Sequence, residues 1–119
     1  MLKANASITG TYDATTTNYS NVTGNSDELP NGSGYTTGGY ALTNVNPTSS
    51  GTTAFTDFSA NAAWSSATFT TRGCIIYNTS DGNSAVAVIN FGADYSVSGG
   101  TFEIQWPTAD SSNAIIRIA

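Results

Sequence analysis

The stretch Thr101-Phe102-Glu103-Ile104-Gln105-Trp106 carries the clearest pattern in the chain. Its apolar side chains alternate with polar ones, which is the period of a strand with one buried face and one solvated face. Pro107 follows directly, and proline cannot donate a hydrogen bond to a neighbouring strand. Residues 101–106 therefore predict a half-buried antiparallel strand and an all-β fold class.

Two continuous apolar runs precede this strand. They cover Arg72–Tyr77 and Ala85–Phe91, and residues 78–84 between them are rich in turn-forming Asn, Asp, Gly and Ser. We expect a hairpin of two central strands that is covered on both faces. Gly99-Gly100 predicts a tight turn before the strand at residues 101–106.

The other strand signals are shorter. No segment carries a helical stripe over three turns, although Ala60–Trp64 could form one helical turn. About eight short strands predict a single domain over residues 1–119, an antiparallel β-sandwich or jelly-roll-like fold. The further candidate strands are Ala4–Tyr12, Tyr40–Val45, Thr52–Phe58, Ala67–Thr71 and Ala114–Ile118.

The expected core is drawn from the apolar positions of these strands. The only cysteine lies in an apolar run, where a buried thiol is the usual outcome. The predicted core residues are Trp64, Phe69, Cys74, Ile76, Val86, Val88, Phe91, Phe102, Ile104 and Trp106.

Charge is scarce in this chain. Charged residues make up 9% of the sequence and the net charge is −5, so the polar surface is built mainly from 15 Ser, 19 Thr and 12 Asn. An acidic surface poor in lysine repels nucleic-acid phosphate and anionic lipid, so neither is an expected partner. Short polar side chains lose little entropy when they become ordered, which favours contacts with proteins or sugars.

Catalytic chemistry has few candidates. The sequence contains no histidine, which removes most triads, most zinc sites and most acid–base schemes. We expect no enzyme, cofactor or metal, and the remaining alternative is a hydrolase that uses carboxylates alone. The eight carboxylates, most of them in turn-like contexts, are Asp13, Asp27, Glu28, Asp57, Asp81, Asp94, Glu103 and Asp110.

Four tyrosines lie in polar, glycine-rich surroundings in the first half of the chain. They are Tyr12, Tyr19, Tyr35 and Tyr40. Exposed tyrosine beside Asn and Thr can stack on sugars or anchor a protein interface, so these residues are the predicted docking surface. The alternative is that they pack over the edge of the sandwich with their hydroxyls in water.

Four stretches together form a specific combination. They are Met1–Ala4, Glu28–Gly39, Trp64–Asn78 and Asn90–Phe102. In this order they resemble a family of small structural proteins of tailed bacteriophages. That family shows a Leu-Lys-Val-like first strand, a Glu-φ-Ser-Gly-x-Gly-Tyr-Thr-x-Gly-Gly segment, a Trp-x-Ala-Ser-Thr-Phe-Thr-Ala-Arg strand and an Asp-Phe-Gly-Ala-Asp turn. Two departures are the absence of the N-terminal lead that many members carry and Gly73, where members have an aromatic residue.

The resemblance implies a virion component, made in the host cytoplasm and carried on the capsid surface. A head decoration (cement) protein is the first expectation, with the major capsid protein and further copies of this chain as partners. Its role implies a homotrimer at local three-fold positions. Alternatives are a fibre, receptor-binding or glycan-binding module, and a tail or neck component.

One ion pair is expected from the scarcity of positive charge. Arg72 is one of three positively charged residues, and Asp94 lies three residues after the apolar run Ala85–Phe91. We expect Arg72 to pair with a carboxylate, such as Asp94, and so to order the edge of the sheet.

Overall fold

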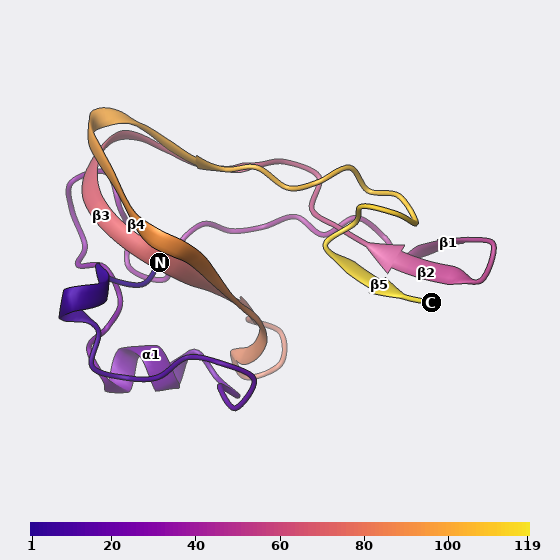
Figure 1. The fold of residues 1–119 in the computed structure, drawn as a ribbon, viewed down its shortest axis with the longest axis horizontal. Helices are drawn as coiled ribbons and strands as arrows, with labels where there is room; N and C mark the ends of the chain where they lie inside the picture. Colours follow the sequence, from indigo (N-terminus) through magenta and orange to yellow (C-terminus); the bar gives the residue numbers. More distant parts are fainter. The chain divides into compact units, whose positions relative to one another are not determined.

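The computed structural model describes residues 1–119 and is mostly β. Strands hold 46% of the residues and helices 7%, and the sheets are antiparallel, so the predicted all-β class is confirmed. The elements in chain order are η1 (Asn5–Ser7), α1 (Ser20–Gly24), β1 (Thr48–Ser50), β2 (Thr53–Thr56), β3 (Ala62–Asn78), β4 (Ser84–Ile104) and β5 (Ile116–Ile118) (Figure 1).

The chain divides into two compact units. The first comprises Met1–Gly39 and Ser66–Gly100, and the second comprises Tyr40–Ser65 and Thr101–Ala119. β3 and β4 contribute residues to both units. The single domain expected over residues 1–119 stays a prediction.

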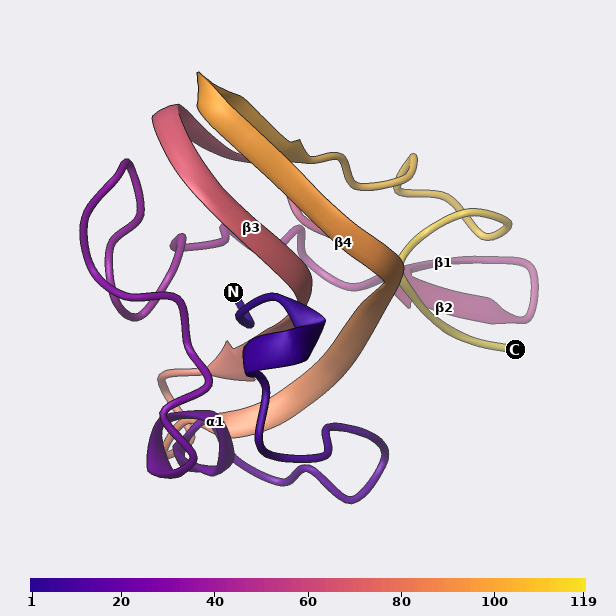
Figure 2. The ribbon, with the colours of Figure 1, turned by 60° about the vertical axis from the view of Figure 1, so that its left-hand side comes forward.

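The hairpin of β3 and β4 dominates the first unit, as the two apolar runs predict. The two strands lie side by side and are much longer than expected (Figure 2). Ala60–Trp64 forms no helical turn, because Ala62 already begins β3. Gly99 has a positive φ of 65°, yet β4 continues through it, and its N–H donates to the Thr68 hydroxyl at 2.9 Å. The predicted tight turn at Gly99-Gly100 is therefore wrong.

The core of the first unit lies against β3, and β4 contributes little to it. β3 buries Ala67, Thr71, Cys74 and Ile76, whereas no residue of β4 is buried. The expectation that both strands are covered on both faces is therefore wrong for β4. The other buried apolar side chains of this unit come from the preceding segments: Met1, Leu2, Val22, Leu29 and Tyr35.

The predicted core is confirmed in part. Trp64, Cys74 and Ile76 are buried. Val86 is 48% exposed, so its assignment to the core is wrong. The remaining predicted core residues are half-buried: Phe69, Val88, Phe91, Phe102, Ile104 and Trp106.

The N-terminal segment does not form the strand predicted at Ala4–Tyr12. It makes only an isolated bridge from Leu2 to Glu28 and then turns into η1. The Leu2 N–H donates to the Gly73 carbonyl at 2.9 Å, and the buried Thr71 hydroxyl donates to the Leu2 carbonyl at 2.7 Å. These bonds attach the start of the chain to β3.

The second unit contains an antiparallel sheet with the order β1-β2-β5. Ala54 pairs with Ser49 on one side and with Ile118 on the other. The strands predicted at Thr52–Phe58 and Ala114–Ile118 are confirmed as the shorter β2 and β5. The strand predicted at Tyr40–Val45 is reduced to one isolated bridge between Asn44 and Phe58.

A buried carboxylate connects the end of β2 to the segment before β5. Asp57 is fully buried, and its two oxygens accept hydrogen bonds from the Phe58 N–H at 2.8 Å and the Ile115 N–H at 3.1 Å. Aromatic pairs also pack within this unit, where Trp64 contacts both Tyr40 and Phe102. Neither short helix of the structure has the length or apolarity to cross a membrane.

Candidate interaction surface

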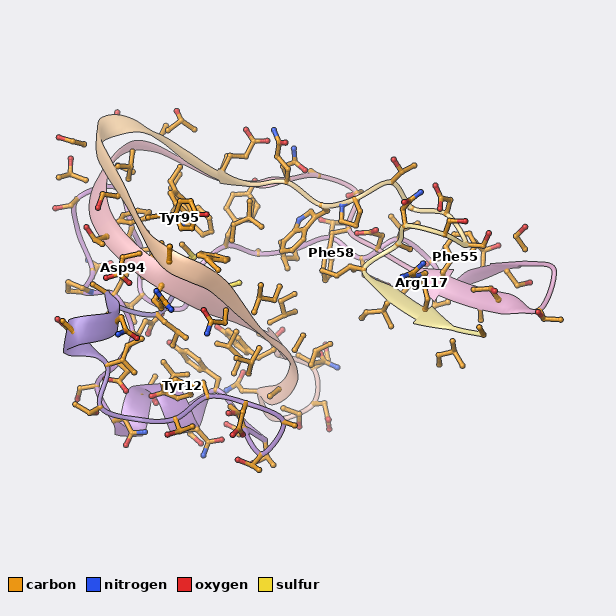
Figure 3. All side chains as sticks on the ribbon, viewed as in Figure 1. Tyr12, Phe55, Phe58, Asp94, Tyr95 and Arg117 are labelled. Carbon is orange, nitrogen blue, oxygen red and sulfur yellow. The ribbon has the colours of Figure 1, made fainter.

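The structure separates the four tyrosines that were predicted to form a docking surface. Tyr35 is 2% exposed, so its ring is not available to a partner. Tyr12 and Tyr19 are half-buried, and their hydroxyls donate to carboxylates of the same chain (Figure 3 labels Tyr12). Tyr40 keeps 44% of its surface exposed. Exposure thus leaves Tyr40 as the strongest candidate of the four for docking.

Glu28 is the centre of a hydrogen-bond network that the sequence did not reveal. Its Oε1 accepts from the Tyr35 hydroxyl and the Gly38 N–H, both at 2.8 Å, and its Oε2 accepts from the Tyr19 hydroxyl at 2.5 Å. Tyr77 stacks on Tyr19 with ring centroids 4.3 Å apart and donates to the Gly38 carbonyl at 2.7 Å. Burial, and then the bond to Glu28, raise the pKa of Tyr19 and Tyr35, so both hydroxyls stay protonated.

Asp27 forms a second, separate clamp. It is 1% exposed and accepts from the Thr9 N–H at 3.0 Å, the Gly10 N–H at 2.7 Å and the Tyr12 hydroxyl at 2.7 Å. Burial opposes ionisation, but the hydrogen bonds from Tyr12, Gly10 and Thr9 together outweigh it and lower the pKa of Asp27. Burial, with help from the bond to Asp27, raises the pKa of Tyr12 to about 12. Both acidic networks hold loops in place.

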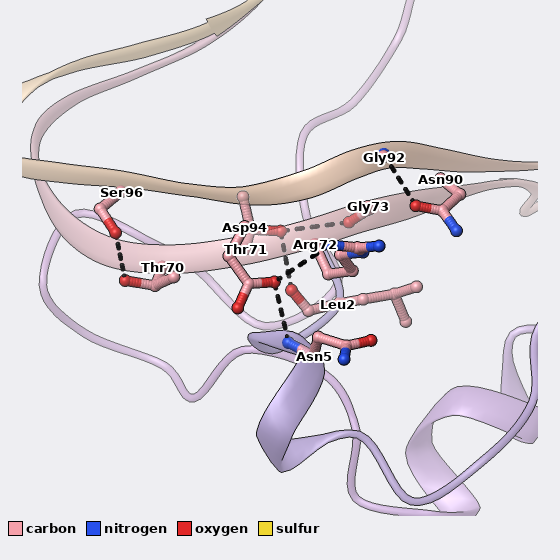
Figure 4. A network of polar contacts seen from close by, with 10 residues as sticks. All are labelled: Leu2, Asn5, Thr70, Thr71, Arg72, Gly73, Asn90, Gly92, Asp94 and Ser96. Carbon is pink, nitrogen blue, oxygen red and sulfur yellow. Dashed lines mark hydrogen bonds and ion pairs between the residues drawn. The ribbon is translucent and has the colours of Figure 1, made fainter.

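The expected pair of Arg72 and Asp94 is present. An Arg72 guanidinium nitrogen lies 4.0 Å from Asp94 Oδ1, and the same oxygen accepts from the Asn5 N–H at 2.9 Å (Figure 4). Asp94 therefore connects β4 to both β3 and η1. Both side chains are partly exposed, at 26% and 36%, so the attraction is weakened by solvent.

Replacing Arg72 by alanine is expected to lower the free energy of unfolding by about 0.2 to 1 kcal/mol, the usual range for a partly exposed ion pair. Urea unfolding of the variant measures this, and Arg117→Ala, on a residue outside the hairpin, is the matched control. A variant with unchanged stability would count against a role for Arg72 in ordering the sheet edge.

Large apolar side chains are exposed at four positions. Val86 and Tyr95 on β4 are 48% and 51% exposed, and Tyr40 and Ile118 in the second unit are 44% and 73% exposed (Figure 3 labels Tyr95). Exposed tyrosines are frequent anchors of protein contacts, whereas single exposed Val and Ile side chains are ordinary on a protein surface. Of these four residues the sequence suggests only Tyr40 for docking, and it predicts Val86 in the core because Val86 lies in the apolar run Ala85–Phe91.

Reactive groups are not gathered in the structure. Burial raises the pKa of the Cys74 thiol to about 11, so it is a protonated thiol at neutral pH. No group of three or more Asp, Glu or Cys residues is placed to hold a metal ion. A surface pocket of about 250 Å³ lies between Leu29–Ser33 and Thr68–Thr70, and it is smaller than typical ligand sites of roughly 300–1,000 Å³.

Comparison with protein-family models, curated proteins and solved structures finds no match to this chain.

Proposed function

We propose that this chain is a structural protein of a tailed-bacteriophage virion, a capsid decoration protein that binds the head shell and stabilises it. The observation that carries the proposal is the resemblance of the four stretches described above. It gains support from their positions, because three of them contact one another in the first unit. The Leu2 N–H bonds to the Gly73 carbonyl, the Thr68 N–H to the Ser33 carbonyl and the Tyr77 hydroxyl to the Gly38 carbonyl.

Residues of the resembling segment stabilise the fold through contacts with one another. Glu28, Tyr35 and Gly38 all belong to the Glu-φ-Ser-Gly-x-Gly-Tyr-Thr-x-Gly-Gly-like segment, and they bond to one another. The segment is then a signature of this fold rather than a binding motif. Docking is left to large side chains that stay exposed, such as Tyr40, Val86, Tyr95 and Ile118.

The proposed partner is the major capsid protein, on the outer surface of the head. Such binding depends on area and shape complementarity, which a rigid β framework with few charges supplies at small entropic cost. Self-association belongs to the proposal, and local three-fold positions on a capsid would require a trimer. Catalysis, nucleic-acid binding and membrane binding form no part of it. The finer fold, a β-sandwich or jelly-roll-like domain, is likewise proposed.

Heating virions with and without this protein tests the proposed role. Particles that lack it are expected to release their DNA at a lower temperature while adsorbing to host cells normally. Equal heat resistance of both particles would contradict the decoration role, and lost adsorption would indicate a fibre or receptor-binding role.

One observation favours glycan binding as a second candidate. Tyr40 is 44% exposed and is held edge-on against buried Trp64, with ring centroids 5.6 Å apart. A rigid exposed aromatic ring can stack on a sugar. A glycan array would show saturable binding that Tyr40→Ala abolishes if this alternative holds, and no binding to any glycan would exclude it.

A further inference from the structure

One edge of β4 has no strand beside it. β3 is its only neighbour in the two-stranded sheet, and the bridge from Asn18 to Ser84 ends just before Val86 (Figure 2). Beside this bridge, the Ala85 N–H donates to the Thr17 carbonyl at 2.9 Å. From Val86 to Val97 no third strand pairs with β4, so this edge can accept a strand of another chain.

This edge lacks the features that usually protect edge strands. Lysine, proline and unpaired charges normally prevent two edges from joining. Residues 86–97 contain no lysine and no proline, and their one charge, Asp94, already contacts Asn5 and Arg72. The segment Val86–Phe91 is apolar throughout except for Asn90, a composition typical of a strand with neighbours on both sides.

The protection that is present is local. Gly92 has a positive φ of 81°, and its N–H donates to the side chain of Asn90 at 2.9 Å. This distorts the strand locally at Gly92 and uses one backbone donor.

We propose that β4 pairs through this edge, residues 86–97, with the same strand of a second copy, antiparallel and about a two-fold axis. Antiparallel pairing of identical strands is self-complementary, since each strand supplies both donors and acceptors. Charge repulsion between two copies would also be small along this edge. Although the chain carries a net charge of −5, the two facing segments bring one paired carboxylate each.

The size of the contact fits a reversible dimer. Twelve strand residues span roughly 40 Å, and with a sheet thickness of roughly 10 Å they cover about 400 Å² per copy. That is about half of a standard interface. A regular ladder of this length holds at most about twelve backbone hydrogen bonds, and the bonded Gly92 N–H of each copy brings this close to the usual number of about ten. The dimer should therefore form and dissociate with concentration.

The inference rests on the proposed function only for its biological setting, because a dimer in solution needs no capsid. It names a two-fold contact, which differs from the trimer that capsid positions would require. Failure of the dimer would leave capsid binding to be judged by the heating experiment, and failure of capsid binding would leave the dimer intact.

Sedimentation equilibrium of the full chain over a range of concentrations tests the contact. The native protein is expected to dimerise, and the double variant Val86→Lys, Tyr95→Lys to raise the dimer dissociation constant tenfold or more, because both positions are exposed on β4. Ser49→Lys, at an exposed position of β1, is the matched control and should dimerise normally. A native protein that stays monomeric, or an oligomer unchanged by the double variant, would overturn the proposal.

Hydrogen exchange of the native protein gives a second test that needs no variant. Amides of residues 86–97 should become more slowly exchanging as concentration rises, while those of residues 48–50 in β1 should not change. Equal exchange of residues 86–97 at low and high concentration would also overturn the proposal.

Discussion

Replacing Asp27 by alanine is expected to lower the free energy of unfolding by about 3 kcal/mol. The carboxylate is buried and accepts hydrogen bonds from Thr9, Gly10 and Tyr12, so its removal leaves several donors without a partner. Hydrogen bonds to a charged group contribute more than neutral ones, and the donors can regain only part of this from water. Urea unfolding followed by circular dichroism measures the loss.

Asp81→Ala is the matched control for this variant. Asp81 is exposed in the turn of the β3–β4 hairpin, so its loss should change stability by less than about 0.5 kcal/mol. Equal stability of the Asp27 and Asp81 variants would show that the hydrogen bonds of the Asp27 carboxylate do not stabilise the folded state.

The same carboxylate predicts a pH dependence. Its folded pKa lies below the ordinary value of 3.8, so its contribution is complete above that value and is lost as pH falls through the folded pKa. Asp27→Asn should lose stability at neutral pH and show a flatter decline in acid than the native protein. Parallel pH profiles for the two proteins would contradict this assignment.

Replacing Gly73 by alanine is expected to cost about 3 kcal/mol of folding free energy. A Cβ at this position would lie 2.3 Å from the carbonyl oxygen of Ile89 and 3.4 Å from the Asn90 Cα. Both are backbone atoms of β4, so relief of the clash requires the two long strands to move apart. Thermal unfolding monitored by circular dichroism measures the effect.

Gly24→Ala is the control for the glycine variant. Nothing lies within 4 Å of a Cβ at Gly24, the last residue of α1, so the change should be nearly neutral or slightly stabilising. A Gly73 variant as stable as the Gly24 variant would show that the strands are not as close as described. The close approach also means that a larger side chain at position 73 cannot fit between β3 and β4 at this spacing.

The hairpin could be predicted because its signal is local. The apolar runs on either side of residues 78–84 are strand-like by themselves, and a turn-rich segment joins them. The length of the strands could not be predicted, because Gly99-Gly100 is a turn signal that tertiary contact overrides. The bond from the Gly99 N–H to Thr68 keeps β4 beside β3.

In the N-terminal segment, long-range hydrogen bonds override the local sequence pattern. Apolar and polar residues alternate over residues 4–12 as in a strand. However, the Asp27 carboxylate accepts hydrogen bonds from the successive N–H groups of Thr9 and Gly10, which point in opposite directions in a strand, so the chain turns here. The same limit applies to the tyrosines. Tyr19 and Tyr35 have polar neighbours in sequence, yet Glu28 binds their hydroxyls from within the fold.

Binding of the purified chain to the capsid can be measured by co-sedimentation with phage heads that lack it. Isolated tails are the comparison. Saturable binding to heads is expected, with a fixed number of copies per particle, and no binding to tails. Binding to tails alone, or to neither particle, would contradict it.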